Sequence, residues 1–221
     1  MIIMNEKAIY SDCESFTAFP DPGKVFSSEL EKRLLLPLGI YKLGDDIESE
    51  VLLAIPLGNE EGLLGIENIG DNCGDLWLTY TNKDGRWSLD CTENNLHSFE
   101  HFSEVAKERF QETKESFKKD GYITSLGDIS SKLPLLHTGG SITSYSNCFC
   151  EIQDHFCHTL SDIPGDEGSL NKYVKVFDKL GHEYRYIGYA EGANYSHRYM
   201  PEFHFFYKKE TKTTLVISEF S

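Results

Sequence analysis

The chain is short of positive charge. Its 221 residues include 21 Lys and Arg against 36 Asp and Glu, which gives a formal net charge of −15 and a pI of about 4.9. An acidic surface repels the phosphates of nucleic acids and the headgroups of anionic lipids. We therefore expect no nucleic acid and no membrane surface as a partner. The charge serves either solubility alone or the attraction of a basic protein.

Long apolar runs are also missing. No stretch approaches the roughly 20 apolar residues that a membrane-spanning helix needs. The first residues, MIIMNEKAIYSDCES, lack the basic and then apolar pattern of a signal peptide, and acids stand at Glu6 and Asp12. We therefore expect a cytoplasmic protein, in which the six cysteines are mostly free thiols, because disulfides are rare in that compartment.

Common catalytic motifs are absent from the sequence. It contains no Gly-rich dinucleotide fingerprint after a strand, no phosphate-binding loop, no H-E-x-x-H and no G-x-S-x-G. These motifs place nucleophiles, metals or phosphates at fixed spacings, so their absence lowers the expectation of an enzyme. We predict a protein that is not an enzyme and needs no cofactor.

Aromatic residues and short apolar segments are abundant instead. With 12 Tyr and 14 Phe, the composition favours pleated sheet, on which flat rings pack well. The segment LWLTYTNKDGRWSLDC predicts a hairpin that turns at Asp84-Gly85. Later segments predict further strands, namely YVKVFD, YRYIGYA, FHFFYKK and TTLVISEF. The expected fold class is α+β with a mainly antiparallel sheet.

One long amphipathic helix is expected over about residues 98–119. Its apolar residues recur near a period of 3.6, Ser98 is in place as N-cap, and Gly121 is in place to end the helix. A shorter helix is expected in SSELEKRLLL, ending before Pro37. The apolar positions of the long helix are Phe99, Phe102, Val105, Ala106, Phe110 and Phe117.

The amino-acid composition changes after Gly121, where Ser, Thr and Gly become frequent. We predict two subdomains on this basis. Residues 1–122 would form an α+β subdomain, and residues 123–221 a β-rich subdomain packed against it.

The segment NCFCEIQDHFCH, residues 147–158, concentrates potential metal ligands. We expect 147–153 to be an interior strand and 154–160 to begin a loop. Two cysteines at C-x-C spacing on a strand lie about 7 Å apart on one face, whereas zinc ligands usually come as C-x(2–4)-C. We therefore predict no metal site, and keep a metal- or thiol-dependent enzyme centred on residues 148–158 as the alternative. The candidate ligands are Cys148, Cys150, His155, Cys157 and His158.

Acidic loops and large aromatic residues are the candidates for binding a partner. The loop GDDIESE and the turn DNCGDLW supply carboxylates, which would steer a basic protein. Aromatic side chains of the predicted hairpin would then serve as anchors. The predicted partner-binding residues are Asp45, Asp46, Glu48, Glu50, Asp71, Asp75, Trp77, Tyr80 and Trp87.

Two segments resemble known bacterial families. ENIGDNCGDLWLTYTNKDGRWSLDC with LHSFEHFSEVAKERF resembles the SUKH type of immunity protein, in which a Gly-rich turn, a hairpin and an S-F-x-x-F helix follow one another. The residues that carry this resemblance are Gly70, Gly74, Asp75, Gly85, Ser98, Phe99 and Phe102. The end of the chain, from residue 182, is similar to YwqG-like proteins. Both resemblances imply a binder without catalytic residues, and the first implies one that neutralises a toxin.

The leading hypothesis is therefore a non-enzymatic acidic binding protein, an immunity protein that covers the active face of a cognate bacterial toxin. The partner would be a protein, such as a basic toxin domain. A structural or oligomeric interaction module is the further alternative, and the sequence leaves the oligomeric state open.

Overall fold

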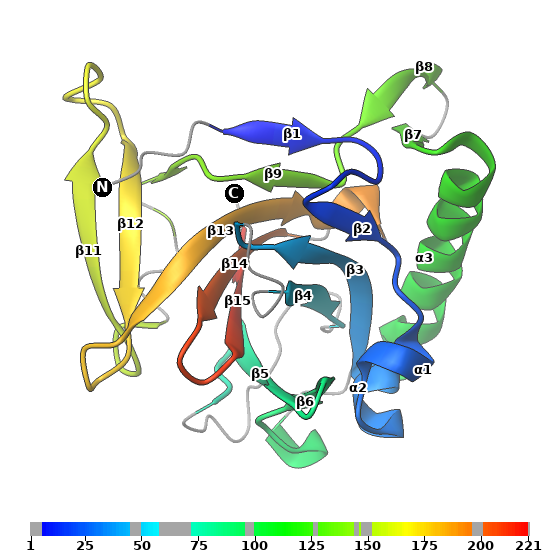
Figure 1. Ribbon diagram of the computed structural model, residues 1–221, viewed down its shortest axis with the longest axis horizontal. Helices are drawn as coiled ribbons and strands as arrows, with labels where there is room; N and C mark the ends of the chain where they lie inside the picture. Colours follow the sequence, from blue (N-terminus) through cyan, green and yellow to red (C-terminus); the bar gives the residue numbers. More distant parts are fainter. Residues whose placement is uncertain are drawn as a thin grey trace.

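The computed structural model describes residues 6–44, 50–57, 72–95, 100–125, 128–143, 146, 152–195 and 201–220 (Figure 1). Within them the helices are α1 (Pro22–Val25), α2 (Glu29–Leu34) and α3 (Glu100–Asp120), with short 3-10 turns η2 (Glu93–Asn95) and η3 (Gly192–Asn194). The strands are β1 (Lys7–Ile9), β2 (Phe16–Ala18), β3 (Leu35–Lys42), β4 (Glu50–Pro56), β5 (Trp77–Lys83), β6 (Arg86–Leu89), β7 (Ile123–Ser125), β8 (Asp128–Leu133), β9 (Leu136–Thr138), β10 (Ile142–Thr143), β11 (Cys157–Asp162), β12 (Asn171–Phe177), β13 (Glu183–Glu191), β14 (Glu202–Lys208) and β15 (Thr213–Glu219). The predicted α+β class is confirmed.

A ten-stranded antiparallel sheet dominates the fold. Its main path runs β1-β9-β13-β14-β15-β5-β6, and β12 joins β13 while also pairing with β10 and β11. The predicted hairpin is present as β5 and β6, and Asp84 and Gly85 both adopt the positive φ that a tight turn needs. The predicted strands FHFFYKK and TTLVISEF are β14 and β15, which pair with each other as a second hairpin.

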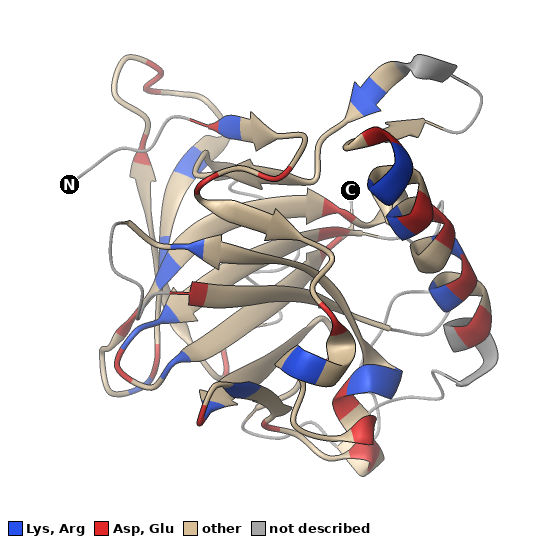
Figure 2. Cartoon of the chain, turned by 45° about the vertical axis from the view of Figure 1, so that its right-hand side comes forward, with Lys and Arg blue, Asp and Glu red and all other residues tan. Residues whose placement is uncertain are grey.

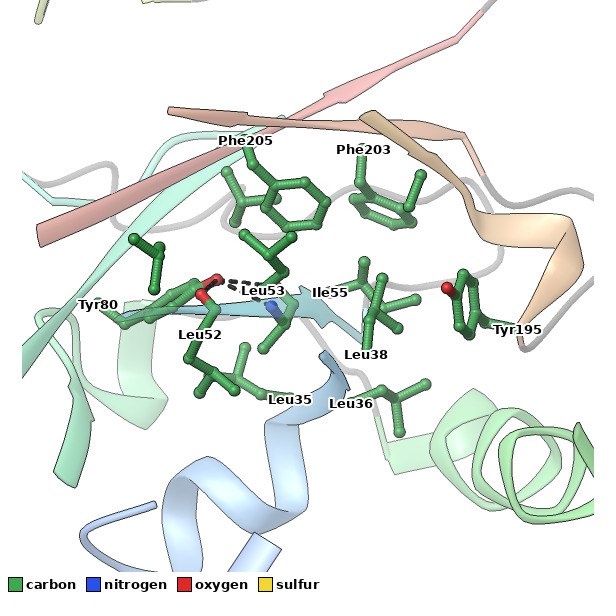
Figure 3. Close-up of a cluster of buried hydrophobic side chains, with 14 of the residues drawn as sticks. Leu35, Leu36, Leu38, Leu52, Leu53, Ile55, Tyr80, Tyr195, Phe203 and Phe205 are labelled. Atoms are coloured by element: carbon green, nitrogen blue, oxygen red, sulfur yellow. Dashed lines mark hydrogen bonds between the residues drawn. The ribbon is translucent and has the colours of Figure 1, made fainter. Parts of the chain in front are cut away.

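A three-stranded sheet, β2-β3-β4, packs on one face of the large sheet. Its strand β4 is an edge strand, yet every residue from Val51 to Ile55 is fully buried. The Tyr80 hydroxyl serves this buried edge, because it accepts a hydrogen bond from Ala54 N at 2.9 Å and lies 3.1 Å from Leu52 O (Figure 3). Buried backbone groups need such partners. Phe205 of β14 and Leu53 of β4 contribute to the same core (Figure 3).

The long helix α3 was predicted close to its observed bounds. Gly121 ends it with φ +75° and a hydrogen bond from its N–H to Phe117 O of 2.7 Å. Ala106 and Phe110 are buried as expected, and the Phe110 ring lies 5.5 Å from Phe19. Val105, expected on the apolar face, is 51% exposed. Ser98 and Phe99 lie outside the described residues.

The predicted short helix is α2, which begins with a capping box between Ser28 and Glu31. The Glu31 carboxylate also accepts a hydrogen bond from Leu89 N at 3.1 Å, which ties α2 to β6. The chain passes directly from Leu34 into β3, where Pro37 stands beside a register shift. A bulge of this kind accommodates a residue that has no N–H to donate.

Two sequence-based expectations need correction. The boundary near residue 122 does not separate two cores, because β15 pairs with β5 in one sheet and one apolar cluster contains residues such as Leu53 and Phe205 from both sides of it. The segment 154–160, expected to begin a loop, instead enters strand β11 at Cys157 and pairs with β12. Five of the six residues of β11 are exposed, so its sequence has little of the apolar pattern that marks a strand.

The two faces of the large sheet support different structures. On β14, Phe203, Phe205 and Tyr207 face the main core with the small sheet. The alternate residues His204 and Phe206 face the other side, because successive side chains of a strand point to opposite faces. There a second apolar cluster forms around Phe206, Leu215, Ile217 and Trp77.

Candidate functional site

Three glutamates stand side by side at one end of the large sheet. In the strand register Glu191 of β13 is paired with Glu202 of β14, and Glu202 is paired with Glu219 of β15. Directly opposed residues of neighbouring strands share a face, with Cβ atoms roughly 4.5–5.5 Å apart. Figure 2 shows acidic segments at these strand ends beside the C-terminus. We call Glu191, Glu202 and Glu219 the glutamate row.

A fourth glutamate joins the row through His137 of β9. The Nδ1 atom of His137 lies 3.0 Å from Glu6 Oε1, and its Nε2 lies 3.8 Å from Glu191 Oε1. Since a carboxylate only accepts, the short contact places a proton on Nδ1. The Tyr189 ring stacks on His137 with centroids 4.5 Å apart, and its hydroxyl donates to Glu6 at 3.4 Å.

Gly188 allows β9 to approach β13 closely enough to place His137 beside the glutamate row. This glycine has φ +149° at a register shift in β13, and a Cβ there would lie 1.9 Å from His137 O. A side chain would therefore push β9 away from β13. The missing Cβ permits the close approach that sets His137 beside Tyr189.

His204 lies beneath the row, with a side chain only 4% exposed. The Tyr186 hydroxyl lies 3.0 Å from its Nδ1, and its Nε2 lies 3.7 Å from Glu202 Oε2. That Nε2 has no hydrogen-bond partner among the described residues. Burial lowers the pKa of His204 to about 4, so at neutral pH the ring is uncharged and leaves the row's negative charge standing.

Burial and neighbouring carboxylates act together on Glu202. Burial raises the pKa of its carboxyl group, and the charges of Glu191 and Glu219 raise it further. Like charges opposite one another on a sheet destabilise the fold. Among the described residues, the basic side chains beside Glu6, Glu191 and Glu202 are His137 and the uncharged His204, and no Lys or Arg forms an ion pair with these three carboxylates. A cation placed over the row would relieve this repulsion.

The kind of cation follows from the spacing of the ligands. No group of three His, Cys, Asp or Glu side chains among the described residues converges closely enough to hold a metal ion. A row of carboxylates along adjacent strands suits instead an elongated or planar organic cation, such as a guanidinium, which two carboxylates can share through several N–H donors.

The predicted aromatic anchors lie in the protein interior. Trp77 and Tyr80 are fully buried, and Trp87 is 5% exposed. Trp77 packs its ring edge against Phe156 in the second apolar cluster, with centroids 5.0 Å apart, and Tyr80 serves the edge of β4. A partner cannot reach Trp77 and Tyr80 on the folded chain, so their role is to hold the core together. Alternating aromatic residues in a hairpin predict burial as readily as binding.

The predicted acidic residues divide into two groups. Asp45, Asp46, Glu48 and Asp71 lie outside the described residues. Asp75 is half-buried, while Glu50 begins β4 and is exposed. Glu50 lines a pocket of about 250 Å³ together with Trp87, Asn82 and Lys212. The structure thus brings Glu50 and Trp87 together, but a lysine shares their pocket and reduces its negative charge.

The cysteine- and histidine-rich segment is described only in its second half. Cys148 and Cys150 lie outside the described residues. The His155 ring packs on Trp77 at 5.1 Å, and Cys157 and His158 are neighbours on β11, where adjacent side chains point apart. Packing against aromatic rings accounts for the position of His155.

Sequence reasoning missed the glutamate row. Its members stand at strand ends in YAEG, PEF and ISEF, far apart in the chain. The available signal was a glutamate at the end of β13, at the start of β14 and at the end of β15, but it acquires meaning only when the pairing register is known. His204 lies in the predicted strand FHFFYKK, and it is buried.

Comparison with other proteins adds no relative: no family model matches the sequence, and no curated protein or solved structure is significantly similar to it. Among the described residues, no helix has the length and apolar character needed to cross a membrane.

Proposed function

We propose that this protein is a non-enzymatic binder of a basic protein and that the glutamate row receives an arginine or lysine side chain of that partner. The observation that carries the proposal is the direct pairing of Glu191 with Glu202 and of Glu202 with Glu219. A fold that retains a repulsive arrangement in adjacent strands gives up stability, and such sacrifices are typical of functional sites.

Binding would proceed in two stages. The net charge of −15 attracts a basic partner and accelerates the encounter, an effect that salt weakens. A guanidinium then enters the row and forms charge-assisted hydrogen bonds with the carboxylates. His204, whose Nε2 lies 3.7 Å from Glu202 Oε2, is uncharged at neutral pH and leaves the negative charge of that carboxylate available to the guanidinium.

The finer proposal is that the partner is a bacterial toxin domain, neutralised in the cytoplasm when its active face is covered. The resemblance of the hairpin and the start of α3 to SUKH-type immunity proteins supports it, as does the acidic charge. Many toxin domains that act on nucleic acids need basic residues to hold phosphates, and a row of carboxylates is complementary to such residues.

The first experiment compares two triple variants of equal charge. One changes the row, Glu191→Gln with Glu202→Gln and Glu219→Gln. The matched control changes three exposed glutamates of α3, Glu104→Gln with Glu108→Gln and Glu112→Gln. Titration calorimetry with an arginine nonapeptide at low salt should show affinity lowered at least about tenfold, equivalent to about 1.4 kcal/mol, in the row variant only.

Equal weakening in both variants would mean that net charge alone drives binding, and the row would lose its proposed role. The toxin proposal needs a separate test. Each toxin gene adjacent in the native genome is expressed with the wild-type chain or with the row variant. Survival with the wild type alone is the expected result, and no rescue by either chain would overturn the toxin proposal while leaving the peptide result intact.

A further inference from the structure

Two cysteines that are distant in sequence meet at the base of the β5–β6 hairpin. Residues Asn72 and Asp90, which precede them, both bond to Thr79: Thr79 N donates to Asn72 O at 3.0 Å, and Asp90 N donates to Thr79 O at 3.1 Å. The Asn72 side chain also donates to Asp90 O at 3.3 Å. The segments that carry Cys73 and Cys91 are therefore held side by side by their hydrogen bonds to the backbone of Thr79.

A side-chain hydrogen-bond interaction between the thiols of Cys73 and Cys91 shifts the pKa of both, and Cys73 Sγ donates to Gly74 O at 3.8 Å. Cys73 is 1% exposed and is fixed by a β-bridge to Leu78. Cys91 is half-buried at the margin of the main core, which leaves it open to small molecules. Both are free thiols in this structure.

The two thiols differ in how readily they ionise. The hydrogen bond to Cys91, together with burial, raises the pKa of Cys73 well above its ordinary value. The same hydrogen bond lowers the pKa of Cys91, although burial and the charges of Asp90 and Glu31 oppose it. Cys91 is thus the thiol that ionises first. A thiolate is the reactive form of cysteine.

We propose that Cys73 and Cys91 are a redox pair that forms a reversible disulfide when a peroxide is the oxidant. The Cys91 thiolate attacks one peroxide oxygen, the O–O bond breaks, and a sulfenic acid and hydroxide are formed. The Cys73 sulfur then attacks the Cys91 sulfur and loses its proton, and the sulfenic hydroxyl leaves as water. Two thiols and one hydrogen peroxide give one disulfide and two waters.

The disulfide would close the open end of the hairpin. It would link the segment that enters β5 to the segment that leaves β6, and so restrict the unfolded chain. Cytosolic disulfides are usually transient and redox-sensing rather than structural, and a half-buried bond at a sheet margin remains open to reducing thiols. This inference does not depend on the glutamate row.

The test uses the full chain, reduced and then treated with stoichiometric hydrogen peroxide. After thiol blocking and proteolysis without reductant, mass spectrometry should find a linked peptide pair containing Cys73 and Cys91, which dithiothreitol restores to thiols. The double variant Cys13→Ser with Cys157→Ser, which removes two exposed thiols, should give the same pair. In Cys73→Ala, the reagent dimedone should label Cys91 as a sulfenic acid.

Circular dichroism of Cys73→Ala and Cys91→Ala keeps the test interpretable, since only folded variants are scored and the linked pair of the wild type decides in any case. The proposal is overturned when Cys73 and Cys91 remain thiols under conditions that oxidise Cys13 and Cys157. It is also overturned when Cys91 links to another cysteine in preference to Cys73.

Discussion

Glu202 lies directly opposite Glu191 across the β13–β14 pair, so that two negative charges occupy one cross-strand position. Glu219 repeats the relationship on the other side of Glu202. Sheets ordinarily place opposite charges or apolar pairs at such positions. The arrangement is understandable when the fold is completed by a cation from outside.

Neutralising Glu202 should stabilise the free protein while weakening its binding. For Glu202→Gln we expect the free energy of unfolding at pH 7 to rise by about 0.5–1 kcal/mol, because two like-charge pairs are removed. Denaturant titration measures this change, and peptide titration measures the binding loss. The matched change Glu104→Gln on exposed α3 should alter neither quantity appreciably.

The sign of the pH dependence follows from the raised pKa of Glu202. The folded state holds this proton more strongly than the unfolded state, so Glu202 makes the wild type less stable as pH rises above its ordinary pKa of about 4.3. The advantage of Glu202→Gln should therefore be present at pH 7 and disappear below pH ~4. An advantage that is the same at both pH values would show that charge repulsion is not its cause.

His204 should make the protein sensitive to mild acid. Its pKa is lowered to about 4 by burial, whereas an unfolded histidine titrates near pH ~6.5. The unfolded state therefore takes up the proton first, and stability should fall as pH drops from ~6.5 toward ~4, by at most on the order of 3 kcal/mol.

The variant His204→Gln removes this titration and should flatten the stability curve between those pH values. It also removes the contact of the Tyr186 hydroxyl with His204 Nδ1 and places an amide in a buried site, so we expect lower stability at neutral pH, by about 1–3 kcal/mol. Chemical denaturation at several pH values checks both effects. The variant His182→Gln, at an exposed histidine paired with Asp178, is the control for histidine titration elsewhere; an unchanged slope in His204→Gln would contradict the assignment.

Tyr80→Phe should expose the dependence of β4 on a single hydroxyl. The change leaves Ala54 N without its 2.9 Å partner in the interior, and an unsatisfied buried donor costs about 1–3 kcal/mol. Hydrogen exchange should show faster exchange at Ala54. The same substitution at Tyr10, which is 42% exposed, should have little effect, and equal losses at the two positions would refute the proposed role of Tyr80.

The parts of the fold that the sequence predicts are those with local signals. The β5–β6 hairpin follows from alternation and from Asp84-Gly85, and α3 follows from its apolar period and Gly121. The shared sheet does not, because pairing of β15 with β5 depends on residues far apart in the chain. The glutamate row could not be predicted from the sequence for the same reason. Trp77 and Tyr80 were predicted to bind a partner but lie buried in the core. Aromatic content alone does not distinguish a core residue from a binding residue.

Gly188→Ala should damage both the fold and the site. A Cβ at this position would meet His137 O at 1.9 Å in a backbone conformation with φ +149°, so β9 must move away and His137 must leave Glu6 and Glu191. We expect a loss of stability above about 3 kcal/mol and weaker peptide binding in whatever fraction remains folded.

Gly165→Ala is a matched control, because Gly165 also has a positive φ, +85°, but nothing within 4 Å of its added Cβ. That control should lose only about 1 kcal/mol, which is the cost of the backbone conformation alone. Thermal and denaturant unfolding of the two variants decide the matter: similar losses would mean that φ rather than the close approach of β9 makes glycine necessary at position 188.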